Sequence, residues 1–250
     1  MPSDASFAAA LAIRTGLSPA RTKKRLKELE DSGHLIPSWP VGAVLETLVE
    51  HLLVHETYFY RHPVQLEFLR AAVFPLLDRQ RITAERSNLL LWSAGCATGE
   101  EAWTLALLAE HLPFRMLATD LSLSALHTAR AGHYTPSPGL DSFRSMPDAA
   151  RARLGHGPWH APEHLRSRLT FARHNVLTPS PVTSVDLILC RNVMIYFDAA
   201  GVATAQHHLA AALRPGGILL LGPADPEPTT GLGLVPIRHG EATAWQRPAG

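Results

Sequence analysis

The chain has 250 residues, a formal net charge of +1 and two cysteines, Cys96 and Cys190. A chain of this length buries a sizeable core without disulfide bonds, and its nearly balanced charge argues against bulk electrostatic binding of nucleic acid. The sequence shows no secretory signal and no apolar run of about 18 residues, so we expect a cytoplasmic protein without membrane insertion.

Residues 1–78 predict a small, all-helical N-terminal domain. Ser18 and Pro19 supply an N-cap and a first-turn proline for one helix. Apolar residues at helical spacing predict another helix over residues 41–53 and a further one that begins near Pro63.

A dense group of positive charges lies in the helix that follows Ser18. Its members are Arg21, Lys23, Lys24, Arg25 and Lys27, and three acidic residues come directly after them. The simplest interpretation is a solvated helix face with internal ion pairs.

Beyond a predicted linker at residues 79–88, short apolar runs alternate with helical segments. The runs are LLLWSAG, FRMLATD, VDLILC and GGILLLG. Runs that are apolar throughout and separated by helices are typical of a parallel sheet buried on both faces. Residues 89–250 therefore predict an α/β domain whose ligands sit at the carboxyl ends of the strands. A stretch without periodicity, at about 133–168, predicts a small inserted subdomain.

The first apolar run leads through Gly95 into a helix that begins with Glu100 and Glu101. Small residues in this loop let the backbone approach a nucleotide-like ligand, but paired carboxylates at a helix N-terminus repel a pyrophosphate. A cationic sulfonium with an amino-acid tail is compatible with them, which indicates S-adenosylmethionine. Asp120 ends the next run and is placed to accept hydrogen bonds from both ribose hydroxyls.

Several segments carry a family resemblance. In order, WSAGCATGEEAWTLALL, LATDLSLSALHTARAGHY, FARHNVL, DLILCRNVMIYFD and LRPGGILLLG resemble the motifs of the CheR-type chemotaxis receptor glutamate methyltransferases. HETYFYR at residues 55–61 resembles that family's Asn-Glu-Thr-Tyr-Phe-Phe-Arg segment. The most specific piece is Cys-Arg-Asn at 190–192 followed by Ile-Tyr-Phe at 195–197, because generic methyltransferases lack it.

The resemblance implies a Rossmann-like, class I S-adenosylmethionine-dependent methyltransferase domain behind the helical domain. The expected cofactor contacts, from the loop and the resemblance together, are His55, Thr57, Arg61, Gly95, Glu100, Asp120, Asn175, Val176, Arg191 and Asn192. Tyr196 and Arg61 are the expected catalytic residues, with Tyr196 near the transferable methyl group.

The resemblance also implies a reaction, the O-methylation of glutamate side chains on a chemoreceptor or a related signalling protein. Its products are glutamate methyl esters and S-adenosylhomocysteine. A glutamate is already ionised at neutral pH, so the site needs alignment and exclusion of water rather than a general base. The histidines do not combine with cysteine or aspartate at metal-binding spacing, and we expect no metal.

The implied partner is the acidic helical bundle of a chemoreceptor, which would dock on Arg21, Lys24 and Arg25. The inserted subdomain corresponds to a small β-subdomain that docks a receptor tail in some members of the family. We expect the enzyme to be a monomer.

Two departures from the family pattern leave alternatives open. His55 replaces the usual asparagine, and Gly222-Pro223-Ala224-Asp225 replaces the usual Gly-His-Ser-Glu. These changes support a second hypothesis, a catalytically weak sensor or scaffold that binds S-adenosylmethionine in a chemosensory array. A third hypothesis is a small-molecule O-methyltransferase, which predicts a deep apolar cavity instead of an open basic face.

Overall fold

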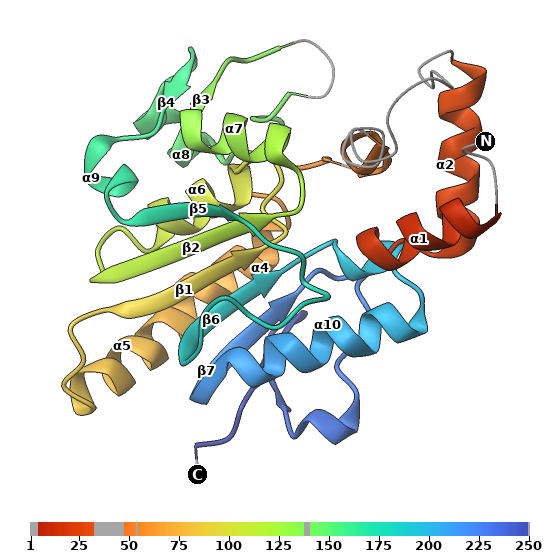
Figure 1. Cartoon of the computed structure of the whole chain (residues 1–250). Coiled ribbons are helices and arrows are strands. Elements are labelled where there is room, and N and C mark those ends of the chain that lie inside the picture. The colour runs from red at the N-terminus through yellow and green to blue at the C-terminus, as the bar shows by residue number, and fades with distance from the viewer. Residues whose placement is uncertain (1–4, 33–47, 54, 138–140, 250) are drawn as a thin grey trace.

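The computed structural model describes residues 5–32, 48–53, 55–137 and 141–249 (Figure 1). Within them lies a seven-stranded sheet of order β5-β2-β1-β6-β7-β9-β8. Its strands are β1 (Leu89–Ala94), β2 (Phe114–Asp120), β5 (Leu169–Arg173), β6 (Val185–Cys190), β7 (Leu213–Leu221), β8 (Val235–His239) and β9 (Ala242–Gln246). The strands from β5 to β7 pair in parallel, and β9 is antiparallel to both of its neighbours. The predicted α/β fold with a mostly parallel sheet is confirmed.

Helices cover both faces of the sheet. Successive side chains of the central strands point to opposite faces, and each face has its own apolar cluster. In β1, Leu89 and Leu91 join a cluster with the helices of one face, whereas Trp92 and Ala94 join a cluster with the opposite face. The first face carries α4 (Pro63–Phe68), the π-helical turn η1 (Leu69–Val73), α5 (Phe74–Thr83) and α6 (Glu100–Leu108). The second face carries α10 (Ala199–Ala212). α7 (Leu123–Ala131) follows β2 and contacts β2 and β5.

Helices α4 and α5 pack with the sheet. Leu66, Phe74 and Leu77 are buried in the same cluster as Leu89 and Leu91. α5 also continues to Thr83, through the first half of the expected linker at 79–88. The domain division after residue 78 stays a prediction, while the packing joins residues 63–83 to the sheet.

A separate apolar cluster holds the N-terminal helices together. It contains residues from α1 (Ala5–Thr15), from α2 (Pro19–Asp31) and from the helical residues 48–52, among them Leu11, Leu26 and Leu52. As predicted, Ser18 caps α2, accepting a hydrogen bond from the Arg21 N–H, and Pro19 opens the helix. Most of the helix predicted at 41–53 lies outside the described residues.

The insert forms a short antiparallel ribbon with two small helices. The ribbon is β3 (His133–Tyr134) with β4 (Trp159–His160), and the helices are α8 (Asp148–Leu154) and α9 (Glu163–Arg166). Its core is aromatic. The fully buried ring of Phe59 lies 5.0 Å from Tyr134, 5.3 Å from Phe143 and 5.2 Å from Trp159, measured between ring centroids.

Two single-turn 3-10 helices complete the described structure, η2 (Met194–Tyr196) after β6 and η3 (Thr230–Leu232) before β8. In the described part of the chain, no helix has the length and apolar character to cross a membrane.

Candidate functional site

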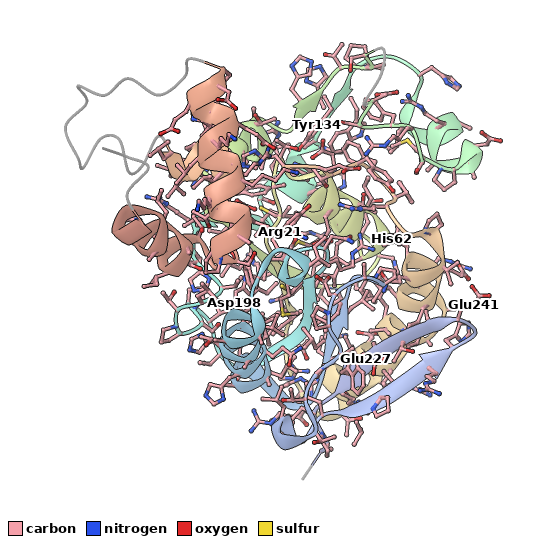
Figure 2. The ribbon with its side chains drawn as sticks, turned by 90° about the vertical axis from the view of Figure 1, so that its right-hand side faces the viewer. Arg21, His62, Tyr134, Asp198, Glu227 and Glu241 are labelled. Atoms are coloured by element: carbon pink, nitrogen blue, oxygen red, sulfur yellow. The ribbon has the colours of Figure 1, made fainter. Side chains whose placement is uncertain are left out.

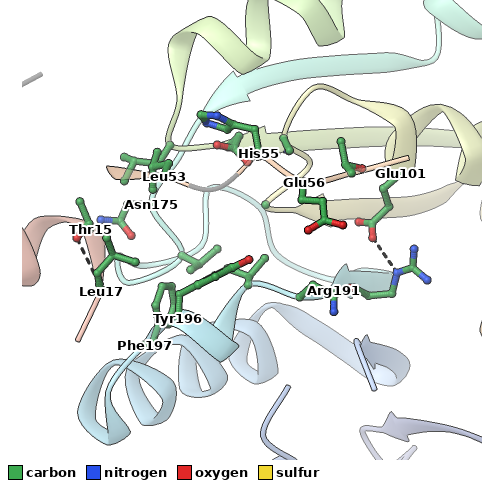
Figure 3. A pocket seen from close by; sticks show the side chains of 18 of the residues that line it. Thr15, Leu17, Leu53, His55, Glu56, Glu101, Asn175, Arg191, Tyr196 and Phe197 are labelled. Atoms are coloured by element: carbon green, nitrogen blue, oxygen red, sulfur yellow. Dashed lines mark hydrogen bonds and ion pairs between the residues drawn. The ribbon is translucent and has the colours of Figure 1, made fainter. Parts of the chain in front are cut away.

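A pocket opens at the carboxyl ends of the parallel strands, between the sheet and the N-terminal helices (Figure 3). It contains about 900 Å³ of space between protein atoms, including its opening to solvent. The lining residues come from six chain segments: Thr15, Leu17, Leu53, His55, Glu56, Thr57, Arg61, Gly95, Ala97, Glu101, Asp120, Leu121, His174, Asn175, Val176, Arg191, Asn192, Val193, Tyr196 and Phe197.

The loop after β1 brings its backbone close to the pocket because Gly95 has no side chain. Gly95 has φ +86°, and a Cβ atom there would overlap with Cγ2 of Val193. Two residues further on, the Ala97 N–H donates a 2.8 Å hydrogen bond to the Asp120 carboxylate. The loop and the end of β2 therefore hold each other in place at the floor of the pocket.

Asp120 presents a carboxylate at the end of β2. Oδ2 accepts from the Ala97 N–H, and Oδ1 accepts from the Ser122 N–H at 2.9 Å. Burial raises the pKa of Asp120, while these backbone hydrogen bonds act in the opposite direction. Each oxygen has a further lone pair, so the carboxylate can still accept hydrogen bonds from a ligand.

Within the described residues, three buried side-chain nitrogens have no hydrogen-bond partner: Nε2 of His55, Nε of Arg61 and Nδ1 of His174. All three residues line this pocket. Leaving a buried polar group unsatisfied costs about 1–3 kcal/mol, and native structures contain few such groups. Their concentration around one cavity fits a pocket that binds a polar ligand.

Comparison with known proteins decides the family. The family described as CheR methyltransferase, SAM binding domain, matches residues 55–229. The chain belongs to the CheR methyltransferase family. S-adenosylmethionine is therefore its cofactor, and the unsatisfied nitrogens and the Asp120 carboxylate fit that molecule.

Three relatives show how far the similarity extends. A chemotaxis protein methyltransferase of Borreliella burgdorferi is 28% identical over 225 residues, which cover 86% of this chain and 80% of that protein. One from Listeria innocua is 31% identical over 186 residues, covering 73% of this chain and 69% of that protein. An uncharacterized 104.1 kDa protein of Rhodobacter capsulatus is 34% identical over 189 residues, covering 72% of this chain but only 20% of its own length.

Of the two acidic residues that begin α6, the structure brings Glu101 to the CheR pocket. Oε1 of Glu101 accepts from the Ser93 hydroxyl at 2.7 Å, and Oε2 accepts from Nε of Arg191 at 2.8 Å. The Arg191 guanidinium also donates to the Arg61 carbonyl at 2.8 Å and to Gln65 at 3.2 Å. The pair is buried, and it joins β1, β6 and the segment before α4.

Glu100 is not among the residues that line the pocket. Its carboxylate accepts from the hydroxyls of Thr98 and Ser142, each at 2.7 Å, and so ties the loop to the insert. Consecutive residues of a helix point about 100° apart, so only one of the two glutamates can face the pocket. The predicted contact of Glu100 with the cofactor stays a prediction, while Glu101 is the one of the two that lines the pocket.

Asn175 and Asn192 line the pocket, but their carboxamides already have partners. Asn175 donates to the Arg14 carbonyl at 2.7 Å and accepts from the Leu177 N–H at 3.0 Å. Asn192 has φ +59° and accepts from Nε2 of His62 at 3.1 Å. The structure thus brings Asn175, Asn192 and the neighbouring Val176 to the pocket, and their contacts with the cofactor remain predictions.

Asp225 does not line the pocket but supports a segment that does, and the sequence reasoning treated it only as a departure. Its carboxylate accepts from the backbone N–H groups of Gly222 at 2.9 Å, Ile195 at 3.1 Å and Asn192. Burial raises the pKa of Asp225, and these hydrogen bonds act in the opposite direction. The retained acidic side chain was the signal: Asp225 stands where the family has glutamate, and it still holds the segment that carries Asn192 and Tyr196.

Glu50 connects the helical residues 48–52 to the ligand-binding side of the sheet. Its carboxylate accepts from the hydroxyls of Ser122 and Ser124 and, at 2.6 Å, from the Leu123 N–H. Burial acts to raise the pKa of Glu50, but these hydrogen bonds outweigh it and the pKa is lowered. Glu50 therefore fastens the N-terminal helices to the start of α7, next to Asp120.

The predicted catalytic residues both reach the pocket. The Tyr196 side chain extends across it toward the side where Glu56 and Glu101 lie (Figure 3). Nη1 of Arg61 donates to the Glu56 carbonyl at 2.6 Å, while its Nε has no partner among the described residues. These residues present a hydroxyl and a guanidinium to the same cavity.

The three predicted docking residues on α2 lie outside the pocket and have different contacts. Nζ of Lys24 is 4.0 Å from the Glu28 carboxylate, and Nη1 of Arg25 is 3.2 Å from it. The guanidinium of Arg21 lies over the Tyr196 ring, 5.2 Å from its centroid. In the described part of the chain, His, Cys, Asp and Glu residues form no group of three or more that could hold a metal ion.

Proposed function

We propose that this methyltransferase esterifies glutamate side chains of chemoreceptors or related signalling proteins, acting as a monomer in the cytoplasm. The observation that carries the proposal is the position of the basic helix: α2 begins at the rim of the pocket, so that Arg21 contacts Tyr196. An acidic helix that docks on α2 would thereby bring its carboxylates to the pocket. The names of the relatives in Borreliella and Listeria support a role in chemotaxis.

The residues of the pocket suit a reaction that needs no proton transfer. The bound cofactor supplies an electrophilic methyl group on a sulfonium. The acceptor glutamate is ionised at neutral pH, so the protein has to align it and exclude water. In our proposal the unpartnered Nε of Arg61 helps to hold a carboxylate and the Tyr196 hydroxyl orients the acceptor.

The cofactor contacts follow from the same geometry. We propose that Asp120 accepts hydrogen bonds from the ribose hydroxyls and that His55 and Thr57 line the amino-acid end beside Gly95. His55 contributes a ring nitrogen where the family has an amide, and either group can hydrogen-bond an amine.

Two structural observations weigh against the other hypotheses. Asp225 makes hydrogen bonds that order the Asn192–Tyr196 segment, so an acidic side chain supports this segment despite the Gly222–Asp225 departure. The pocket is lined by charged residues from several segments, which does not match the deep apolar cavity of a small-molecule methyltransferase.

The decisive experiment uses methyl-labelled S-adenosylmethionine and the cytoplasmic fragments of chemoreceptors. We expect label on the receptor that mild alkali releases as methanol, since carboxyl methyl esters hydrolyse under these conditions. The Asp120→Asn variant, which keeps the side-chain shape, is the matched control and should transfer far less label. Alkali-stable label would refute the ester assignment, and cofactor binding without transfer would favour the sensor hypothesis.

A second experiment tests the docking face. The double charge reversal Lys24→Glu/Arg25→Glu should raise the KM for the receptor and weaken its salt dependence, while cofactor affinity stays the same. An unchanged KM at low ionic strength would show that these residues form a solvated face.

A further inference from the structure

The contact between Arg21 and Tyr196 joins two parts of the molecule with different proposed tasks. Arg21 lies in the first turn of α2 (Figure 2), the helix proposed to dock the partner. Tyr196 lies in η2, lines the cofactor pocket and is half-buried. The 5.2 Å separation of the guanidinium carbon from the ring centroid is within the range of a cation–π interaction.

Backbone contacts fix both residues, so the stack does not depend on side chains alone. The Ser18 N–H donates to the Tyr196 carbonyl at 3.1 Å, and Leu17 forms a β-bridge with Phe197. The approach is close, because a Cβ atom on Gly16 would lie 2.9 Å from the Phe197 ring. The turn between α1 and α2 is therefore attached to the segment that carries Tyr196.

The other predicted docking residues make different contacts. Lys24 and Arg25 both reach Glu28, an acid of their own helix. The three predicted docking residues thus separate into two cations that pair with Glu28 along the helix surface and one cation, Arg21, that contacts the pocket residue Tyr196. A uniform docking role for all three residues does not follow from this geometry.

We propose that Arg21 is a positioning residue: it holds the Tyr196 ring against α2 and so transmits docking of a partner on this helix to the orientation of the Tyr196 hydroxyl. The inference rests on the proposed function for the nature of the partner. It changes the expectation for Arg21, whose loss should lower kcat rather than raise KM alone.

The charges around Tyr196 provide a readout that needs no partner. Burial raises the pKa of the Tyr196 hydroxyl; the positive charges of Arg61 and Arg21 act to lower it, and Glu56 and Asp225 act to raise it. Removing the Arg21 charge should therefore move ionisation of this phenol to higher pH. Arg21→Lys keeps a cation near the ring and should retain most of the wild-type behaviour.

The first test is an ultraviolet difference titration of the tyrosines in the full chain. Subtracting the curve of Tyr196→Phe isolates Tyr196 from the other three tyrosines. Arg21→Met should shift this curve to higher pH, and Arg21→Lys should restore it. Lys23→Met, which removes an exposed cation of the same helix, should leave it in place. Superimposable curves for wild type and Arg21→Met would overturn the proposal.

The second test separates kcat from KM in receptor methylation. An exposed cation–π contact corresponds to a factor of about two to five, so Arg21→Met should lower kcat at saturating receptor by about that factor, with partial rescue in Arg21→Lys. Lys24→Met and Arg25→Met should change mainly KM. If Arg21→Met raises KM and keeps the wild-type kcat, Arg21 is a docking residue and the inference is wrong. Should wild type itself fail to methylate the receptor, the proposed function fails, and the titration alone decides whether Arg21 positions Tyr196.

Discussion

The buried pair of Glu101 and Arg191 should be one of the most sensitive points of the enzyme. In Glu101→Gln the amide keeps the shape and can still bond Ser93 and Arg191, but the positive charge of Arg191 loses its compensation. At their 2.8 Å separation, unit charges attract by about 6 kcal/mol for an effective dielectric constant of about 20. Breaking such a pair in other proteins costs about 3–5 kcal/mol.

A loss of this size is a large part of the stability of an ordinary protein, about 5–15 kcal/mol. For a chain of this length each kcal/mol corresponds to about 2–4 °C, so Glu101→Gln should unfold about 6–20 °C below wild type. Urea denaturation followed by the fluorescence of the five tryptophans measures the free energy of unfolding. Calorimetry with S-adenosylhomocysteine should show weakened binding as well, because both residues line the pocket.

The double variant Glu101→Gln/Arg191→Gln is the matched control, since it removes the uncompensated charge. We expect it to be at least about 2 kcal/mol more stable than Glu101→Gln alone, as residues in direct contact are not additive. A Glu101→Gln protein within about 1 kcal/mol of wild type, or a double variant whose loss equals the sum of the single losses, would refute the reasoning.

Three further substitutions test other parts of the site. Gly95→Ala should weaken cofactor binding at least about tenfold by calorimetry, since its Cβ would meet Val193, which lines the pocket; Gly155→Ala, which has the same φ of +86° but open space, should bind normally. Tyr196→Phe should lower kcat and kcat/KM together with unchanged cofactor affinity, and a loss confined to affinity would make Tyr196 a binding residue. Glu50 has a lowered pKa when folded, so its ionised form stabilises the protein above the unfolded value near 4.5, and this contribution disappears as the pH falls through the folded pKa. Glu50→Gln should flatten the pH dependence of unfolding below about pH 5 by less than about 1 kcal/mol, since solvent screens the half-buried carboxylate, and parallel profiles would contradict this role.

The sheet was predictable from the sequence because its central strands are buried on both faces. Each of the six residues of β6 is buried and all but Asp186 are apolar, and such a run leaves few other interpretations. The sequence did not indicate β8 and β9, because these strands are not buried on both faces. β8 lies at the edge of the sheet with mostly exposed side chains, including Pro236, and carries no apolar pattern.

The sequence predicted which chain segments form the site better than it predicted which side chains face the pocket. Glycine and carboxylate at the ends of β1 and β2 follow from chain order, and the structure brings Gly95 and Asp120 together there. The choice between Glu100 and Glu101 depends on the phase of α6, which a single sequence does not fix. The contact of Arg21 with Tyr196 depends on how the helices dock on the sheet, and no local pattern contains that information.

The aromatic core around Phe59 has a consequence for how members of the family can diverge. Phe59 belongs to the segment whose neighbours line the cofactor pocket, yet its ring packs among the insert residues Tyr134, Phe143 and Trp159, and its N–H donates to the Ser142 carbonyl. An insert with a different core therefore cannot be transplanted alone. It would no longer pack well against Phe59, and the resulting displacement would reach Tyr58 and Thr57, the latter a residue that lines the pocket. Chimeras that exchange the insert, residues 133–168, should be active only when residue 59 is exchanged with them, so a natural change in the insert's core should be accompanied by a change at residue 59, beside the cofactor pocket.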